Sequence, residues 1–352
     1  MMKKGSKNVS VLVIVLCSLC IISCKKNTSI LDLNVEKESL QHKVLKLDSE
    51  LYKIGYICVF DSLLFVKDET RDAYFTLINL NSNEVICRFG EKGKGPGEMK
   101  WPLFITCNEK HKTFEVNAIQ PKGLVVYHID SLINENVHYK PTVLKFDVDK
   151  NSIYSVDRLG DSLFIAKGGF HAGQFAIINE LGELLSVQGN YPTEEESVHQ
   201  DQYILGKTYQ GFIKTHPQLP KFVYTSLVGS IIEFCDLDNK NNLKKYRFYY
   251  SDYPRFRVSG YNSALYSDNI VGYSSLYTTG KYVYVLYSEE NVMNYEKNPY
   301  MFNTILKFNW DGELVKKYTT DIQIRTIAVS SDDKVIYGTS ANPVPKIVKF
   351  EL

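Results

Sequence analysis

Two recurring sequence units most constrain how this chain can fold. The first is a polar turn followed by a short hydrophobic strand, found at residues 61–66, 161–166, 280–285 and 333–337. The second is a strand, a polar turn and a further strand, found at residues 74–89, 175–185 and 304–315. Weaker copies of the pattern begin near Leu124, Ser230 and Lys346. Six copies spaced roughly 40 to 75 residues apart are close to the period of β-propeller blades.

The residues within these units favour strands over helices. The apolar runs are short and rich in Val, Ile, Tyr and Phe, and aromatic residues make up 13% of the chain, which is typical of strands. The sequence therefore predicts an all-β fold, a six-bladed β-propeller with four-stranded antiparallel blades, over residues 46–352. The first unit is predicted to be the second strand of a blade, and the second unit its third and fourth strands. Two β-sandwiches side by side are the alternative.

The final copy of the pattern predicts how the ring closes. Residues 345–352 supply only a third strand, so the outer strand of the last blade has to come from elsewhere. Residues 30–35 and 44–47 are apolar or alternating, and we expect one of them to pair with the C-terminal segment. Such closure hides strand edges that an open array would expose. Gly182 and Gly312 suit the hairpin turns because glycine tolerates a positive φ.

Residues 89–102, FGEKGKGPGEMKWP, form a glycine-rich corner between the first and second blades. Four glycines and a proline cannot sit inside a helix or a central strand. A phosphate-binding loop is the alternative, but the spacing fits neither the P-loop nor the dinucleotide fingerprint, and Pro96 has no amide hydrogen for an anion. We predict a structural role for the motif residues Gly90, Gly93, Gly95, Pro96, Gly97, Glu98 and Pro102.

The N-terminus has the pattern of a lipoprotein export signal. Three lysines precede the apolar run Val9–Ile22, which ends in Ile-Ile-Ser-Cys at Cys24. A basic start and a short apolar core indicate a secretory signal peptide rather than a membrane span. Because the last four residues resemble the bacterial lipobox, we expect residues 1–23 to be removed, Cys24 to be lipidated and residues 24–45 to form a tether with a closing strand. An uncleaved anchor helix or cleavage at another site are the alternatives.

The lipobox, the six units and the motif Phe-Gly-x-x-Gly-x-Gly-Pro-Gly-Glu-x-x-x-Pro together resemble the TolB-like or NHL-like six-bladed propeller lipoproteins of Bacteroidetes. Met99 stands where an aromatic residue is commoner in that family. The resemblance covers nearly the whole mature chain, and it implies an envelope propeller with no generally established reaction. The residues after Cys24 lack the acidic cluster of surface-exported lipoproteins. We therefore expect an anchor in the outer membrane, with the propeller facing the periplasm.

Composition and motifs argue against several classes of function. Lys and Arg total 41 against 40 Asp and Glu, so no basic field is present to recruit nucleic acid. The histidines form no His-Glu-x-x-His pair and no Gly-x-Ser-x-Gly elbow is present, so we predict no metal and no cofactor. One or two disulfides are compatible with an exported chain, but spacing does not assign the pairing. The cysteines concerned are Cys58, Cys87, Cys107 and Cys235.

Two long departures from the blade spacing, residues 189–220 and 246–277, combine aromatic and basic residues. Long loops on a rigid scaffold often carry binding groups, and exposed rings beside arginines suit stacking on flat ligands. The alternative is that these tyrosines fill space between blades. The candidate ligand-binding residues are Tyr191, Tyr203, Tyr209, Tyr253, Arg255, Arg257 and Tyr261.

The sequence thus predicts a membrane-anchored binding or protein-interaction module of the cell envelope, with a protein or a glycan as its ligand. One alternative is an envelope hydrolase or lyase, with polar groups from several blades converging at the mouth of the central channel. Such convergence is not visible in a linear sequence, so no catalytic residue is assigned. A scaffold subunit of a larger envelope complex is the third hypothesis.

Overall fold

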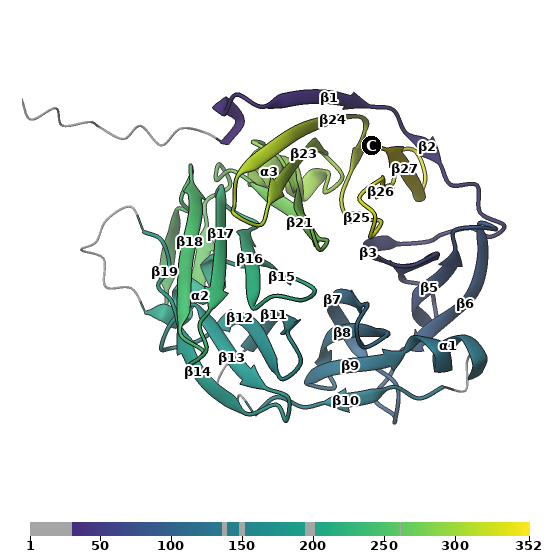
Figure 1. Cartoon of the computed structure of the whole chain (residues 1–352), viewed down its shortest axis with the longest axis horizontal. Coiled ribbons are helices and arrows are strands. Elements are labelled where there is room, and N and C mark those ends of the chain that lie inside the picture. Colours follow the sequence, from purple (N-terminus) through teal and green to yellow (C-terminus); the bar gives the residue numbers. More distant parts are fainter. Residues whose placement is uncertain (1–29, 136–138, 148–151, 194–200, 261) are drawn as a thin grey trace, which may run out of the picture.

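Six β-sheets surround a central axis like the blades of a propeller (Figure 1). This computed structural model describes residues 30–135, 139–147, 152–193, 201–260 and 262–352. The polypeptide runs around the ring in sequence order, so consecutive blades are neighbours in space (Figure 1). The predicted all-β, six-bladed architecture with four-stranded blades is confirmed, and the alternative of two sandwiches is wrong.

In each blade the first strand lies nearest the axis and the following strands step outward. Blade 1 contains β3 (Ile54–Phe60), β4 (Leu63–Asp68), β5 (Ala73–Asn79) and β6 (Glu84–Glu91). Blade 2 contains β7 (Lys100–Asn108), β8 (Thr113–Gln120), β9 (Gly123–His128) and β10 (Thr142–Leu144). Blade 3 contains β11 (Ser152–Leu159), β12 (Leu163–Gly169), β13 (Phe175–Asn179) and β14 (Leu184–Gln188).

The second half of the ring follows the same order. Blade 4 contains β15 (Gly211–Thr215), β16 (Lys221–Ser226), β17 (Ile231–Leu237) and β18 (Leu243–Tyr250). Blade 5 contains β21 (Tyr273–Thr278), β22 (Tyr282–Tyr287), β23 (Phe302–Asn309) and β24 (Leu314–Ile324). Blade 6 contains β25 (Ile327–Val329), β26 (Val335–Ser340) and β27 (Lys346–Glu351). An additional hairpin, β19 (Phe256–Ser259) and β20 (Asn262–Leu265), lies between blades 4 and 5.

The predicted strand order within the blades is confirmed. The polar-turn units become the second strands β4, β12, β22 and β26, and the strand-turn-strand units become third and fourth strands. Gly182 and Gly312 occupy the predicted hairpin turns with φ of 86° and 76°. The cores lie between adjacent blades: Phe65 of blade 1, for example, stacks on Phe114 of blade 2 with ring centroids 4.6 Å apart. Apolar residues therefore face the neighbouring blade on both faces of a sheet.

The N-terminal segment closes the ring, as predicted, but only one of the two candidate strands takes part. Strand β2 (Lys43–Val44) pairs antiparallel with β27 and supplies the missing fourth strand of blade 6. The N–H of Leu45 then donates to the carbonyl of Ile347 at 2.9 Å. The other candidate, residues 30–35, is not a strand: Ile30–Asp32 forms a short 3-10 turn, and Ile30 is buried against the core of blades 4 and 5.

A further N-terminal strand was not expected from the sequence. Strand β1 (Glu36–Leu40) runs parallel to β24 and adds a fifth strand to blade 5. The ammonium of Lys316 lies 2.8 Å from the carboxylate of Glu36 and 2.6 Å from that of Glu38. Four of the five residues of this strand are polar, and only Leu40 is buried in the core, so a search for apolar alternation does not detect it.

The glycine-rich motif connects β6 of blade 1 to β7 of blade 2. A Cβ on Gly93 would lie 1.7 Å from a carboxylate oxygen of Glu98, and one on Gly90 would lie 2.5 Å from the ring of Phe75. The Glu98 carboxylate instead folds back over the loop and accepts the N–H of Gly95 at 2.7 Å. Close approach of side chains to the backbone explains why glycine occupies these positions.

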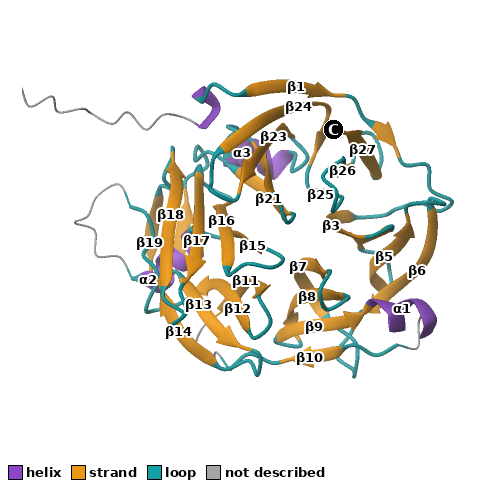
Figure 2. Ribbon diagram, in the orientation of Figure 1, coloured by secondary structure: helices purple, strands orange, loops and turns teal. Residues whose placement is uncertain are grey.

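Helices contribute little to the part of the chain that the structure describes (Figure 2). They are α1 (Ile129–Glu135), α2 (Gln202–Thr208) and α3 (Val292–Lys297). In the described ranges, no helix has the length and apolar character needed to cross a membrane. The predicted signal peptide and Cys24 lie outside the described residues.

Candidate functional site

A cavity of about 280 Å³ opens at one mouth of the central channel. It lies where the first strands of the blades end, so all six blades contribute to its lining. Side chains from blades 3, 4 and 5 reach this mouth, among them Asp157, Lys214 and Tyr277. Convergence of this kind was anticipated for the channel mouth, but the sequence alone named none of these residues.

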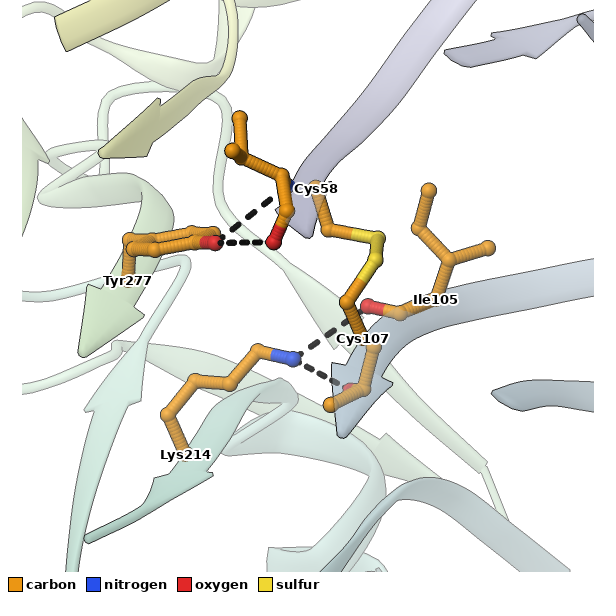
Figure 3. Close-up of a disulfide and its surroundings, with 7 residues drawn as sticks. Cys58, Ile105, Cys107, Lys214 and Tyr277 are labelled. Carbon is orange, nitrogen blue, oxygen red and sulfur yellow. Dashed lines mark hydrogen bonds between the residues drawn. A yellow bond between two sulfur atoms is a disulfide. The ribbon is translucent and has the colours of Figure 1, made fainter. Parts of the chain in front are cut away.

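A disulfide forms part of the cavity wall (Figure 3). It joins Cys58 of β3 to Cys107 of β7, with the two Cα atoms 5.9 Å apart. The sequence left this pairing open because the two cysteines are 49 residues apart and approach each other only through blade packing. Cys87 and Cys235 are free thiols, both buried, and burial raises their pKa.

Two side chains cross the channel and form the floor of the cavity (Figure 3). Lys214 of blade 4 donates through Nζ to the carbonyl of Ile105, at 3.2 Å, and to the hydroxyl of Thr106, both in blade 2. The hydroxyl of Tyr277 in blade 5 lies 3.3 Å from both the N–H and the carbonyl of Val59 in blade 1. These contacts connect blades that are not neighbours in the ring, blade 4 with blade 2 and blade 5 with blade 1.

Beneath this floor the channel is closed by three aromatic rings. Tyr56, Phe104 and Phe212 come from the first strands of blades 1, 2 and 4, and their centroids lie 5.2, 5.4 and 6.1 Å apart. Only a cavity of about 30 Å³ remains between the plug and the floor. The channel mouth is therefore a blind pocket rather than a passage through the ring.

Burial shapes the chemistry of the ionisable groups at the mouth. Burial lowers the pKa of Lys214, and the charges of Asp157 and Glu115 oppose that shift. Oδ2 of Asp157 accepts the N–H and the hydroxyl of Thr215 at 2.8 and 3.1 Å. Glu115, beside the pocket, pairs with Arg158 at 3.1 Å, and burial raises its pKa.

His216 at the pocket edge is held by the backbone. Its Nδ1 accepts the N–H groups of Gln218 and Leu219 at 2.9 and 3.0 Å, and a hydrogen bond links it to the backbone of Gly280. The imidazole packs on Trp310, with centroids 4.8 Å apart, and burial lowers its pKa. This histidine therefore shapes the pocket wall and has no free nitrogen to act as a base.

The two predicted departures from blade spacing meet on the opposite face of the ring. They are shorter than predicted, because β15, β18 and β21 within them are ordinary blade strands. Two segments lie outside the regular blade strands, and we call them the first and second excursions. The first carries α2 and lies between blades 3 and 4, and the second carries β19 and β20 and lies between blades 4 and 5. Lys207 of α2 donates to the side-chain oxygen of Asn262 at 3.0 Å. An open depression of about 330 Å³ lies between the two segments, which we call the excursion groove.

Close backbone contact fixes α2 against blade 3. A Cβ on Gly206 would lie 2.4 Å from the carbonyl oxygen of Gly168, so only glycine permits this approach. Asp201 caps the helix by accepting the N–H of Tyr203 at 2.9 Å. The ring of Tyr203 stacks on His171, with centroids 5.1 Å apart, and the Lys207 ammonium lies 4.5 Å from its centroid.

Two of the candidate ligand-binding tyrosines are interior residues. Tyr191 and Tyr209 are 5% and 2% exposed, so the expectation of exposed rings is wrong for them. The hydroxyl of Tyr191 accepts from Lys167 at 2.8 Å, and that of Tyr209 donates to the carbonyl of Pro192 at 2.6 Å. These rings fill the space between blades 3 and 4, as the alternative interpretation held, and they anchor the first excursion.

The other candidates lie nearer the surface. Tyr203 and Tyr253 are half-buried, whereas Arg255 and Arg257 are exposed on or beside β19. Arg255 pairs with Asp268 at 2.7 Å and lies 5.9 Å from the ring of Tyr266. Tyr261 lies outside the described residues, so its predicted role is not addressed.

A buried ionic cluster lies between blades 3 and 4, and it was not predicted from the sequence. Glu233 is fully buried and accepts from Lys245 at 2.7 Å, from Gln174 at 2.8 Å and from the hydroxyl of Tyr250 at 2.6 Å. Fully buried Lys167 lies above the ring of Tyr191 at 4.0 Å, and burial lowers its pKa well below the ordinary range. The sequence feature that could have indicated this cluster is Glu233, a charged residue within the mostly apolar strand β17.

Metal binding has no support in the described ranges. No group of three or more His, Cys, Asp or Glu side chains there is placed to hold a metal ion.

A ring of six blades around a plugged channel defines the chain as a six-bladed β-propeller. The profile of the TolB-like 6-blade propeller-like family matches residues 34–332. The chain belongs to this family. No curated protein matches its sequence.

Solved structures share the fold at low sequence identity. An exported protein of Bacteroides fragilis is 13% identical, with a TM-score of 0.53 over 90% of this chain and 98% of that one. A DUF4221 member from Bacteroides vulgatus is 12% identical, with a TM-score of 0.55 over 90% and 97%. The β-propeller domain of Cps50 (Swd1) from Myceliophthora thermophila is 9% identical, with a TM-score of 0.51 over 88% and 99%. At these identities the comparison establishes the fold alone.

Proposed function

We propose that this propeller is a binding module of the cell envelope, anchored by lipid on Cys24, that takes a protein or a glycan at the excursion groove. The observation that supports this most directly is the meeting of the two excursions. They are far apart in sequence, they interrupt the regular blade pattern, and they pack together through Lys207 and Asn262. Rigid scaffolds typically carry their binding groups on such insertions.

The chemistry of the groove suits a ligand with both polar and flat surfaces. Its lining combines Gln210, Asn262 and Ser263 with the apolar side chains of Leu227 and Leu265. Exposed aromatic and basic groups extend this surface: Tyr266 is 47% exposed, and Arg257 is exposed on β19. Rings and guanidinium groups of this kind stack on sugar faces and on peptide side chains.

The envelope location is supported by the N-terminal signal and by the likeness to an exported Bacteroides protein. We propose that the anchor lies in the outer membrane and that the propeller faces the periplasm. The alternative hydrolase or lyase would need a free acid and base at the channel mouth. At that mouth, both ring nitrogens of His216 are engaged in hydrogen bonds, so this histidine does not supply the base.

Binding is tested with the full chain in detergent, screened by thermal shift and then by titration against glycans and short peptides. A ligand that binds only the folded state raises the unfolding temperature. We expect Arg257→Ala to weaken binding of the ligand found, because Arg257 is exposed on β19, which pairs with the groove-lining strand β20. Arg71→Ala is the matched control, since Arg71 is an exposed arginine on blade 1. Equal affinity of the two variants would place the ligand elsewhere and refute the groove assignment.

Anchoring is tested separately by metabolic labelling with an alkyne fatty acid and by membrane fractionation. We expect Cys24→Ala to lose the label and to leave the membrane fraction, while the propeller stays folded. The lipid contributes only to membrane attachment, at about 0.8 kcal/mol per buried methylene. Label retained by Cys24→Ala would show that the anchor is not at this cysteine.

A further inference from the structure

We propose that the channel mouth is a second, separate binding site, for a small hydroxylated monocarboxylate such as a uronic acid, with the Lys214 ammonium as its anchoring cation. The site lies on the face opposite the excursion groove and shares no residue with it. The inference therefore goes beyond the function proposed above and does not depend on it.

Lys214 is the residue of the pocket that we expect to bind the carboxylate of the ligand. Its ammonium donates to two neutral acceptors, the carbonyl of Ile105 and the hydroxyl of Thr106. An ammonium has three N–H groups, so one remains for a ligand. Among the residues that the structure describes, no carboxylate forms an ion pair with Lys214, and nearby Glu115 is paired with Arg158. Lys214 is half-buried, and Asp157 and Glu115 act on its charge without forming an ion pair with it. A partly desolvated charge gains from an opposite charge in direct contact, and a ligand carboxylate would supply that contact.

The shape of the pocket sets the size and the orientation of the ligand. The plug of Tyr56, Phe104 and Phe212 closes the channel behind Lys214, so a ligand enters from one side only. A cavity of about 280 Å³ is slightly smaller than the pockets that hold drug-sized ligands. This space suits a single sugar ring, with its carboxylate at the floor.

Polar groups nearer the opening suit hydroxyl groups on the same ligand. Asp157 binds Thr215 through Oδ2 alone, which leaves its other oxygen to accept from a hydroxyl. Asn108 accepts the N–H of His111 through Oδ1 at 3.0 Å, which leaves its amide N–H groups to donate. Gln218 and Ser331 also line the mouth. The pocket thus has a cation at the floor and, nearer the opening, hydrogen-bonding groups that include the carboxylate of Asp157.

The charge balance favours a monocarboxylate over a phosphate. Phosphate sites usually gather arginine or several cations, whereas the guanidinium of Arg158 is already bound to Glu115 at 3.1 Å. The carboxylate of Asp157 also lines the pocket and would repel a dianion more strongly than a monoanion. Because the carboxylates of Asp157 and Glu109 both line the pocket beside Lys214, a ligand of single negative charge is repelled less than one of double charge.

Isothermal titration of the full chain in detergent tests the proposal with three probes. D-glucuronate carries the carboxylate and the hydroxyls, D-glucose carries only the hydroxyls and acetate only the carboxylate. We expect glucuronate to bind at least tenfold tighter than either of the others. Glucose binding as tightly as glucuronate, or no detectable glucuronate binding, would overturn the proposal.

Variants locate the site. Lys214→Gln should weaken glucuronate binding at least tenfold, whereas Lys244→Gln, at an exposed lysine on β18, should not change it. If Lys214→Gln does not fold, Gly280→Phe provides a second test of the site. A Cβ on Gly280 would meet no atom within 4 Å, so a ring placed there obstructs the mouth without disturbing the fold. Glucuronate binding retained in Gly280→Phe would refute the site. Arg257→Ala should keep glucuronate binding, which separates this test from that of the excursion groove.

Discussion

Breaking the disulfide between blades 1 and 2 should cost the protein several kcal/mol of stability. Cys58 and Cys107 are 49 residues apart in sequence, so the bond closes a loop of about 50 residues in the unfolded chain. Loop-closure entropy for a loop of that length corresponds to about 4 kcal/mol at 25 °C. The bond joins the innermost strands β3 and β7, so its loss also frees the contact between blades 1 and 2 at the channel wall.

The variant to test is Cys58→Ser combined with Cys107→Ser, and the assay is urea unfolding followed by tryptophan fluorescence. Trp310 is a suitable probe because it is buried, with 7% exposure, beside His216. With a urea m-value of about 3 kcal/mol/M, the expected loss moves the midpoint down by roughly 1 M. Reductant should produce a similar shift in the wild type and none in the double variant.

Cys87→Ser is the control for exchanging a cysteine without breaking a bond. Cys87 is a buried free thiol, so its variant measures the cost of placing a hydroxyl in the core. We expect a smaller midpoint shift than for the double variant. Equal midpoints for the wild type and the double variant without reductant would refute the assignment of this bond as a brace between blades.

Three further predictions address the loop, the opposite end of the channel and the closure of the ring. Gly93→Ala should lower the unfolding free energy by roughly 1 kcal/mol, because its Cβ would displace the Glu98 carboxylate from the N–H of Gly95; calorimetry checks this, with Gly280→Ala expected to be neutral. Burial lowers the pKa of Lys67 from 10.5 to about 8, so wild-type stability should rise between those pH values as the unfolded state binds more protons. Lys67→Met should lack that rise in urea titrations at pH 7.5 to 10.5, and parallel curves would contradict it. A chain that starts at residue 46 lacks β1 and β2 and should melt at a lower temperature than one that starts at residue 41, which keeps β2; equal melting temperatures would contradict closure by β2.

Much of the fold was predictable because local patterning and blade architecture agree. The Asp-Ser-Leu strands and the Leu-Gly and Asp-Gly hairpins each carry their own turn chemistry, so their positions within a blade follow from nearby residues. The third strand that ends the chain at Leu352 implies a partner from the N-terminus, since a ring leaves no free edge there. Strand β1 was missed because it is mostly polar and its partner strand β24 is about 280 residues away in sequence.

The candidate sites were less predictable from the sequence than the fold was. The sequence located the two excursions by their length, but it did not distinguish Tyr191 and Tyr209, which fill the interior, from Arg257, which lies at the surface. That difference depends on which side of a strand or helix faces the neighbouring blade, and a one-residue change of register reverses it. The meeting of α2 with β20 likewise depends on the angular order of blades 3 to 5 around the ring.

Local periodicity and turn residues thus determined the blade, the number of blades and the closure of the ring, because each depends on residues close together in the chain. The pairing of Cys58 with Cys107, the crossing of the channel by Lys214 and the aromatic plug were decided only by tertiary structure. These contacts join first strands of different blades, and such strands face one another only after the ring has closed. The same geometry brings a half-buried ammonium to the floor of a blind pocket, from a strand whose sequence resembles any other inner strand.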